Sequence, residues 1–160
     1  MKKKKKIIIS ILSLISIIIV TIFLFFMVQY FIYKKDIDDI ETINISKSGY
    51  LLSTCMCEID FLNNSFMYET IGYSENDESK TIYKKFTNKD EEFFMKKANL
   101  YGFFCWKKSY DSNVYDGKGV TICIKFTDGS VQEIHCYAKF PLTYDLMADV
   151  FYEAFGYNIL

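Results

Sequence analysis

Residues 120–137, VTICIKFTDGSVQEIHCY, contain the clearest β-hairpin pattern in the chain. Two apolar, alternating runs flank Asp128-Gly129, a dipeptide typical of tight hairpin turns. With a two-residue loop, Cys123 and Cys136 share a face of the hairpin, whereas one additional residue places them on opposite faces. This stretch predicts that the fold is built on an antiparallel sheet.

A second hairpin is predicted upstream of the first. Residues 50–62 alternate, Asn63-Asn64 can adopt the positive φ angles of a tight turn, and 65–73 form the returning strand. Residues 80–86 are a third expected strand. The alternation places one set of side chains on a single face: Leu51, Ser53, Cys55, Cys57, Ile59 and Phe61.

Two helices are expected in the remainder of the chain. Asn88 and Glu91 fit a capping box, and apolar residues then recur at helical spacing. A second helix follows residue 143, with Thr143 as its cap and Gly156 where a helix-terminating glycine belongs. Its expected buried stripe consists of Leu146, Met147, Val150, Phe151, Ala154 and Phe155. The predicted order β-β-β-α-β-β-α indicates an α+β fold, in which two helices pack on one face of an antiparallel sheet.

The amino-terminal region predicts a membrane anchor. Residues 1–6 are a basic tip, and 7–33 are an uncharged run that reaches roughly 40 Å as a helix, enough to span a bilayer with some tilt. That run is nearly twice as long as the apolar region of a cleaved signal peptide. We therefore expect a transmembrane signal-anchor over 7–33, a connector over 34–48 and a folded domain over 49–160.

Charge around the apolar run predicts its orientation. Lysines precede the run, and acidic residues dominate the segment that follows Lys35. The positive-inside bias then places the amino terminus in the cytoplasm and the domain outside the cell. The prediction is a single-pass protein of the cell membrane, with the lipid bilayer as its first partner.

Composition excludes one class of partner. Residues 36–160 carry 12 lysines against 20 acidic residues, a net charge of −8, and the chain has no arginine. Bidentate recognition of phosphate or guanine is therefore absent, so nucleic acid is not an expected partner. The bias towards Lys, Ile, Asn, Tyr and Phe suggests an AT-rich genome, such as that of a low-GC Gram-positive bacterium.

The five cysteines allow two predicted disulfides. Cys55 and Cys57 are two residues apart on one strand, with Cα atoms nearly 7 Å apart, so they cannot easily bridge each other. Either of them can pair with Cys105, and Cys123 can pair with Cys136. The competing interpretation is that all are buried free thiols that behave as small apolar residues.

Catalytic and metal chemistry find little support in the sequence. His135 is the single histidine, and nothing marks an activated thiol beside it. A zinc site needs about four convergent ligands, and these cysteines lie on strands without the usual knuckle spacing. We therefore predict no enzyme activity, no metal and no cofactor. The alternative is a thiol-dependent or metal-dependent envelope protein that uses Cys55, Cys57 and His135.

Aromatic residues give the one positive indication of function. Tyrosines gather in loops and at the ends of elements, and such side chains are common in binding surfaces. We expect an accessory or binding module for a cell-surface protein, peptide or glycan. Another alternative is a small subunit that docks to a larger membrane complex. The candidate surface residues are Tyr73, Trp106, Tyr110 and Tyr115.

The last third of the chain also resembles a known pattern. Residues 116–157 place Asp116-Gly117 before a strand, Asp128-Gly129 between two strands and Pro141 before a closing helix. This arrangement resembles uncharacterised small membrane-anchored or lipoprotein domains of Gram-positive bacteria. The chain has no cysteine for lipid attachment, which favours a helical anchor. The resemblance implies a fold and brings no known activity with it.

Overall fold

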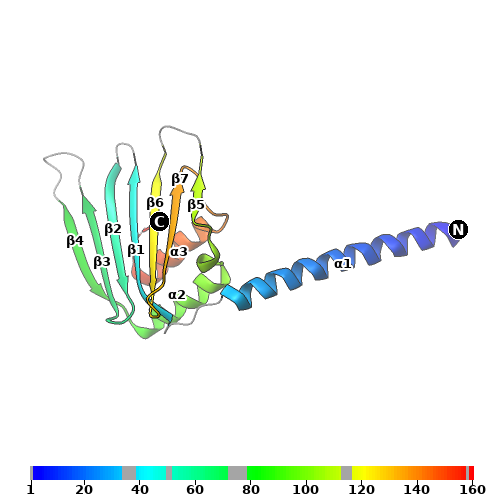
Figure 1. Ribbon diagram of the computed structural model, residues 1–160, viewed down its shortest axis with the longest axis horizontal. Helices are drawn as coiled ribbons and strands as arrows, with labels where there is room; N and C mark the ends of the chain where they lie inside the picture. The colour runs from blue at the N-terminus through cyan, green and yellow to red at the C-terminus, as the bar shows by residue number, and fades with distance from the viewer. Residues whose placement is uncertain (1, 34–38, 50–51, 72–78, 113–116, 158) are drawn as a thin grey trace. The chain divides into compact units, whose positions relative to one another are not determined.

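The computed structural model consists of two compact units, Met1–Lys34 and Lys35–Leu160, which are described separately below (Figure 1). It describes residues 2–33, 39–49, 52–71, 79–112, 117–157 and 159–160. The fold is α+β, with one mixed sheet and helices on one of its faces.

The first unit is the helix α1, Lys2–Tyr33. No glycine or proline interrupts it, and Thr21 Oγ1 donates a hydrogen bond to the Ile17 carbonyl oxygen at 2.8 Å, which keeps this hydroxyl satisfied within the helix. Its described large apolar side chains are exposed, from 38% at Met27 to 62% at Phe23.

The predicted membrane anchor is contradicted over the described residues. A spanning helix needs about 20 consecutive apolar residues. Among the residues that the structure describes, no helix has the length and apolarity to cross a membrane. This finding overturns the transmembrane span over 7–33, the signal-anchor, and the single-pass localisation with a cytoplasmic amino terminus and an extracellular domain.

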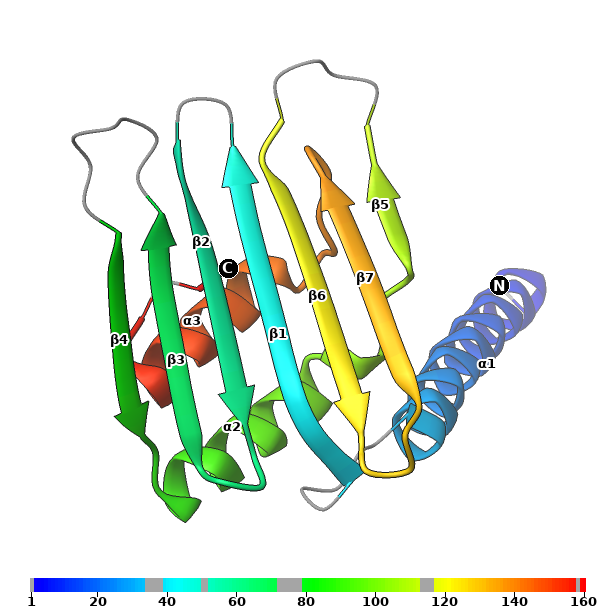
Figure 2. The same cartoon turned by 60° about the vertical axis from the view of Figure 1, so that its left-hand side comes forward.

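The second unit contains a seven-stranded sheet in the order β4-β3-β2-β1-β6-β7-β5 (Figure 2). Neighbouring strands run antiparallel except β5, which lies parallel to β7, so the sheet is mixed rather than purely antiparallel as predicted. The strands are β1 Ile40–Gly49, β2 Leu52–Asp60, β3 Ser65–Ile71, β4 Lys80–Lys85, β5 Ser109–Asp111, β6 Gly119–Phe126 and β7 Val131–Tyr137.

The expected connector is the central strand of this sheet. β1 pairs with β2 on one side and with β6 on the other. Ile43 and Ile45 alternate onto the buried face, whereas Ile40 is one residue out of phase with them. A register shift between Ile40 and Thr42 absorbs the odd spacing, so Ile40 is buried as well. The strand was missed because a bulge disguises its alternation.

The loop that joins β6 to β7 is longer than a two-residue turn, and it is the alternative that places Cys123 and Cys136 on opposite faces. Lys125 pairs with Val131, Phe126 N donates to the Ser130 carbonyl oxygen at 2.9 Å, and Gly129 adopts a φ of +83°. Residues 127–129 therefore form the loop, one residue more than the Asp-Gly pair. As a result, Cys123 and Cys136 lie on opposite faces of the sheet.

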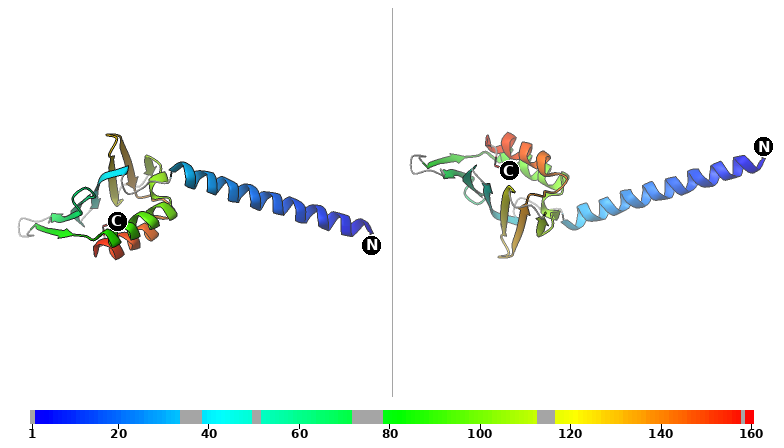
Figure 3. Two further views of the ribbon diagram at one scale, coloured as in Figure 1. Left: turned by 90° about the horizontal axis from the view of Figure 1, so that it is seen from below. Right: turned by 90° about the horizontal axis from the view of Figure 1, so that it is seen from above.

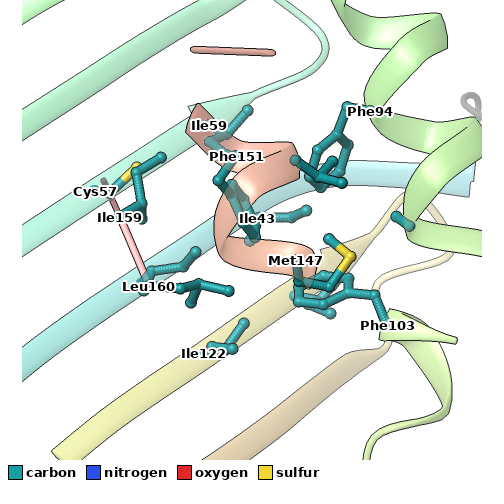
Figure 4. Close-up of a cluster of buried hydrophobic side chains, with 14 of the residues drawn as sticks. Ile43, Cys57, Ile59, Phe94, Phe103, Ile122, Met147, Phe151, Ile159 and Leu160 are labelled. Atoms are coloured by element: carbon teal, nitrogen blue, oxygen red, sulfur yellow. The ribbon is translucent and has the colours of Figure 1, made fainter. Parts of the chain in front are cut away.

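Two helices, α2 (Asn88–Leu100) and α3 (Tyr144–Phe155), cover one face of the sheet (Figures 2 and 3). Phe94 of α2 and Phe151 of α3 are fully buried, with ring centroids 5.0 Å apart. The short 3-10 helix η2, Phe103–Cys105, adds Phe103 to this cluster. Figure 4 shows these aromatic rings together with the strand residues beneath them: Ile43, Cys57, Ile59 and Ile122.

The ends of both helices refine the sequence prediction. The capping box of α2 is formed by Thr87 and Asp90, one residue earlier than predicted, and its hydrogen bonds lower the pKa of the Asp90 carboxyl. Thr143 is the N-cap of α3, but its Oγ1 accepts a hydrogen bond from Trp106 Nε1 at 3.1 Å instead of capping the helix. Gly156 ends α3 with a φ of +80°, as predicted.

Candidate functional site

The sheet has one covered face and one face that α2 and α3 leave open (Figure 3). Because side chains alternate along a strand, residues next to each buried one point to this second face. We call it the open face. Its side chains are small, polar or charged for the most part: Thr42, Asn44, Ser46, Met56, Glu58, Met67, Glu69, Thr81, Tyr83, Lys85, Thr121, Cys123, Lys125, Val131, Glu133 and His135.

A hollow of about 330 Å³ lies on the open face at its β3–β4 end. Met67 of β3 and Tyr83 of β4 are cross-strand partners there, and Tyr83 is 76% exposed. Glu58 and Lys85 also line the hollow. An aromatic ring and a flexible thioether are thus surrounded by both signs of charge, which is how a small contact surface is commonly composed.

A second hollow, of about 190 Å³, lies on the other side of β4. Lys84 and Phe86 contribute to it from the strand and the residue after it. Phe155 and Gly156 contribute from the end of α3, and the Lys84 Nζ lies 3.6 Å from the position that a Cβ at residue 156 would occupy. The strand β4 therefore has a hollow on each side.

At the other end of the open face, His135 lies beside two polar residues. Its Nδ1 is 3.3 Å from Thr121 Oγ1, and its Nε2 is 3.7 Å from a carboxylate oxygen of Glu133. Cys123 is the cross-strand partner of Glu133, diagonal to the histidine. Within the described part of the chain, no three or more His, Cys, Asp or Glu side chains are arranged to hold a metal ion.

The thiols of Cys55 and Cys57, both on β2, lie on the covered face of the sheet. Cys57 is buried beside Ile59, and Cys55 is half-buried and accepts a hydrogen bond from the Tyr68 hydroxyl at 3.4 Å. Burial raises the pKa of Cys57 far above its ordinary value. Burial and the nearby Asp111 carboxylate raise the pKa of Cys136 to about 11. Both thiols are thus held in the protonated, unreactive form.

The structure does not bring the predicted cysteine pairs together, and none of the five cysteines, all of which lie in the described residues, forms a disulfide. Cys105 lies on η2. This short helix lies next to β7, as shown by the hydrogen bond that Gln132 Nε2 donates to the Phe104 carbonyl oxygen at 3.2 Å. Two strands separate β7 from β2, and each step is about 4.8 Å, so Cys55 and Cys57 are out of reach. His135 lies on the open face, opposite these two thiols.

Of the four aromatic residues predicted to form a binding surface, the structure describes Trp106 and Tyr110, and neither side chain is fully exposed. Trp106 is buried, and Tyr110 is half-buried, with its hydroxyl accepting a hydrogen bond from Lys107 N at 2.9 Å. Tyr73 and Tyr115 lie outside the described residues. Met67 was not among the sequence candidates, and Tyr83 was counted only among the tyrosines in loops and at the ends of elements. The alternation of KTIYKK nevertheless places Tyr83 on the face opposite Ile82.

Protein-family models and curated proteins give no relative from which a function of the open face could be inferred. No protein-family model matches the chain, and no curated protein matches it. The resemblance to small Gram-positive domains remains a prediction, and function is inferred from the geometry of the open face and of β4.

Proposed function

We propose that the unit Lys35–Leu160 is a non-catalytic protein-binding module. Its contact surface is the β3–β4 end of the open face, centred on Met67 and Tyr83. The observation that carries this proposal is an exposed aromatic ring, beside a hollow, on the sheet face that the two helices leave uncovered.

The chemistry of this surface suits contact with another protein. Tyrosine supplies a rigid ring and a hydroxyl, and methionine adapts its shape to what it meets. Glu58 and Lys85, at the border of the hollow, supply the polar rim that surrounds the apolar centre of a typical interface. A pocket for a small molecule would instead enclose most of its ligand, and this hollow is shallow and open to solvent.

Three features weigh against the thiol-dependent alternative. The buried thiols of Cys57 and Cys136 have raised pKa values, which disfavours the nucleophilic thiolate. His135 and the pair Cys55 and Cys57 lie on opposite faces of the sheet, so no proton can pass directly between them. The open-face thiol, Cys123, lies diagonal to His135, whose ring nitrogens contact Thr121 and Glu133 instead.

Site-specific photo-cross-linking tests the proposal. A photoreactive phenylalanine analogue replaces Tyr83 in the full-length chain, expressed in its native cells. The matched control places it at Val131, which is also exposed on the open face but at the far end of the sheet. We expect a discrete cross-linked partner from position 83 and none from 131.

A second substitution makes that result specific. Met67→Lys adds a charge beside position 83 and should abolish the cross-link, whereas Cys123→Ser, at the far end of the open face, should leave it intact. Circular dichroism checks that each variant is folded. Equal cross-linking from positions 83 and 131, or a cross-link that survives Met67→Lys, contradicts the proposal.

A further inference from the structure

Among the residues that the structure describes, the strand β4 ends the sheet and pairs with β3 alone (Figure 2). Its side chains are exposed, except that of Ile82, which is half-buried. The outer side of a terminal strand presents backbone N–H and C=O groups that no ladder satisfies, and another extended chain can pair with them. β4 is thus a template for an additional strand.

One hydrogen bond shows which residues of β4 face outwards. Phe86 N donates to the Asn64 carbonyl oxygen at 3.1 Å, so this pair is a hydrogen-bonded one. Hydrogen-bonded and non-hydrogen-bonded pairs alternate along an antiparallel ladder. Lys84 and Ile82 therefore bond inwards to β3. The backbone groups that point away from the sheet belong to Thr81, Tyr83 and Lys85.

The surroundings of β4 suit an added strand. Side chains of an extended peptide alternate between the two faces of the sheet. The hollow beside Tyr83 lies on one face, and the hollow lined by Lys84 and Phe155 lies on the other. A peptide paired with β4 therefore has space for side chains on both faces.

Charge identifies the class of peptide. β4 carries Lys80, Lys84 and Lys85 and no acidic residue, so the side chains directly opposite an added strand are basic. The acidic residues nearby, Glu58, Asp90 and Glu153, line the two hollows from other elements. Pairing with a second copy of β4 brings these like charges together, whereas carboxylates on an incoming strand form opposite-charge pairs with them. We propose, on the basis of the binding function above, that β4 takes up an extended, acidic peptide of the partner protein as an additional edge strand.

The test uses a defined probe and the full-length chain. The probe is a fluorescent ten-residue peptide with glutamate at alternate positions and valine or threonine between them. Its control replaces each glutamate with lysine. We expect the acidic peptide to bind and the basic one not to bind, as measured by fluorescence anisotropy.

Two substitutions at Thr81 isolate the backbone contact. Thr81→Pro removes an outward N–H without breaking a bond to β3, and Thr81→Val retains that N–H. Losing a ladder hydrogen bond and adding a ring against the new strand should weaken binding about tenfold in the proline variant alone. Tyr83 remains in place in both, and melting curves check their folding.

Charge is tested with a matched pair of double variants. Lys84→Gln with Lys85→Gln should lower the affinity about tenfold and reduce its salt dependence. Lys107→Gln with Lys108→Gln removes the same charge near η2 and should change neither. In the unsubstituted chain, hydrogen exchange at the amides of Thr81, Tyr83 and Lys85 should slow when the acidic peptide is added.

The outcomes separate this inference from the proposed function. Equal affinity of the two Thr81 variants, or equal binding of the two peptides, overturns strand addition. If the Tyr83 cross-link to a partner nevertheless persists in Thr81→Pro, the binding function stands without it. Loss of peptide binding in Thr81→Pro but not in Thr81→Val supports strand addition.

Discussion

The two faces of the sheet are made by the same strands and differ in which substitutions each can tolerate without loss of stability. Along β6, Ile122 and Ile124 are fully buried under the helices, whereas Thr121 and Cys123 alternate with them on the open face. One face is thus committed to the core. The other is free to vary its chemistry, which is why we place function on the open face and stability on the covered one.

Energetics support this division. Burying a large apolar side chain contributes about 1.5–3 kcal/mol, so a face composed of such residues dominates the stability of the unit. Substitutions on an exposed polar surface usually change stability by less than about 0.5 kcal/mol. The open face can therefore acquire a Tyr83 or a Lys85 at almost no cost to folding.

The largest expected effect comes from the covered face. Phe151 of α3 is fully buried and contacts the rings of Phe94 and Phe103 at centroid distances of 5.0 and 5.7 Å. Phe151→Ala should lower the free energy of unfolding by about 3–5 kcal/mol. Leu146→Ala on the same helix, where the side chain is 45% exposed, should cost far less. Urea denaturation measures both, and equal losses would contradict the assignment of faces.

Much of the covered face was predictable from the sequence. Alternation placed Cys55, Cys57 and Ile59 together, and α3 was expected to bury Met147, Val150, Phe151, Ala154 and Phe155, all of which are buried. Leu146, predicted to be buried with them, is exposed. The spacing of apolar residues and the presence of turn-forming residues are local properties, so a single sequence is sufficient to recognise them.

The candidate site was not predictable, because it depends on which strands meet. That β4 is an edge follows from the order of all seven strands, and β1, hidden by its bulge, is the central one. The hollow exists because Met67 and Tyr83 share a register position. The disulfide prediction for Cys123 and Cys136 depended on the loop at residues 127–129, whose length the Asp-Gly dipeptide does not fix.

An intermediate effect is expected from a thiol on the covered face. The pKa of Cys136 is raised to about 11, so the folded chain retains this proton between pH 9 and 11 while the unfolded chain loses it. Stability from this group is complete below pH 9 and falls as the pH rises through that range. Cys136→Val should reduce the fall in melting temperature over pH 9–11. An unchanged fall in the Cys136→Val variant would contradict the assignment of this pH dependence to the covered face.

The smallest expected effect concerns a polar atom on the covered side. The hydroxyl of Tyr144 is buried without a hydrogen-bond partner among the described residues, while its ring packs on Phe140 at 4.3 Å. A buried hydroxyl without a partner carries a desolvation penalty, and the ring contributes in either case. Tyr144→Phe should therefore stabilise the unit by about 1 kcal/mol, as measured by chemical denaturation.

Tyr110→Phe is the matched control, since the hydroxyl of Tyr110 accepts a hydrogen bond from Lys107 N. Its removal leaves that amide without its partner and should destabilise the unit by about 1 kcal/mol. The two substitutions delete the same atom and should act in opposite directions. If Tyr144→Phe instead destabilises, its hydroxyl has a partner in the folded chain. The covered side would then accommodate polar groups as the open face does, and burial alone would not separate the two.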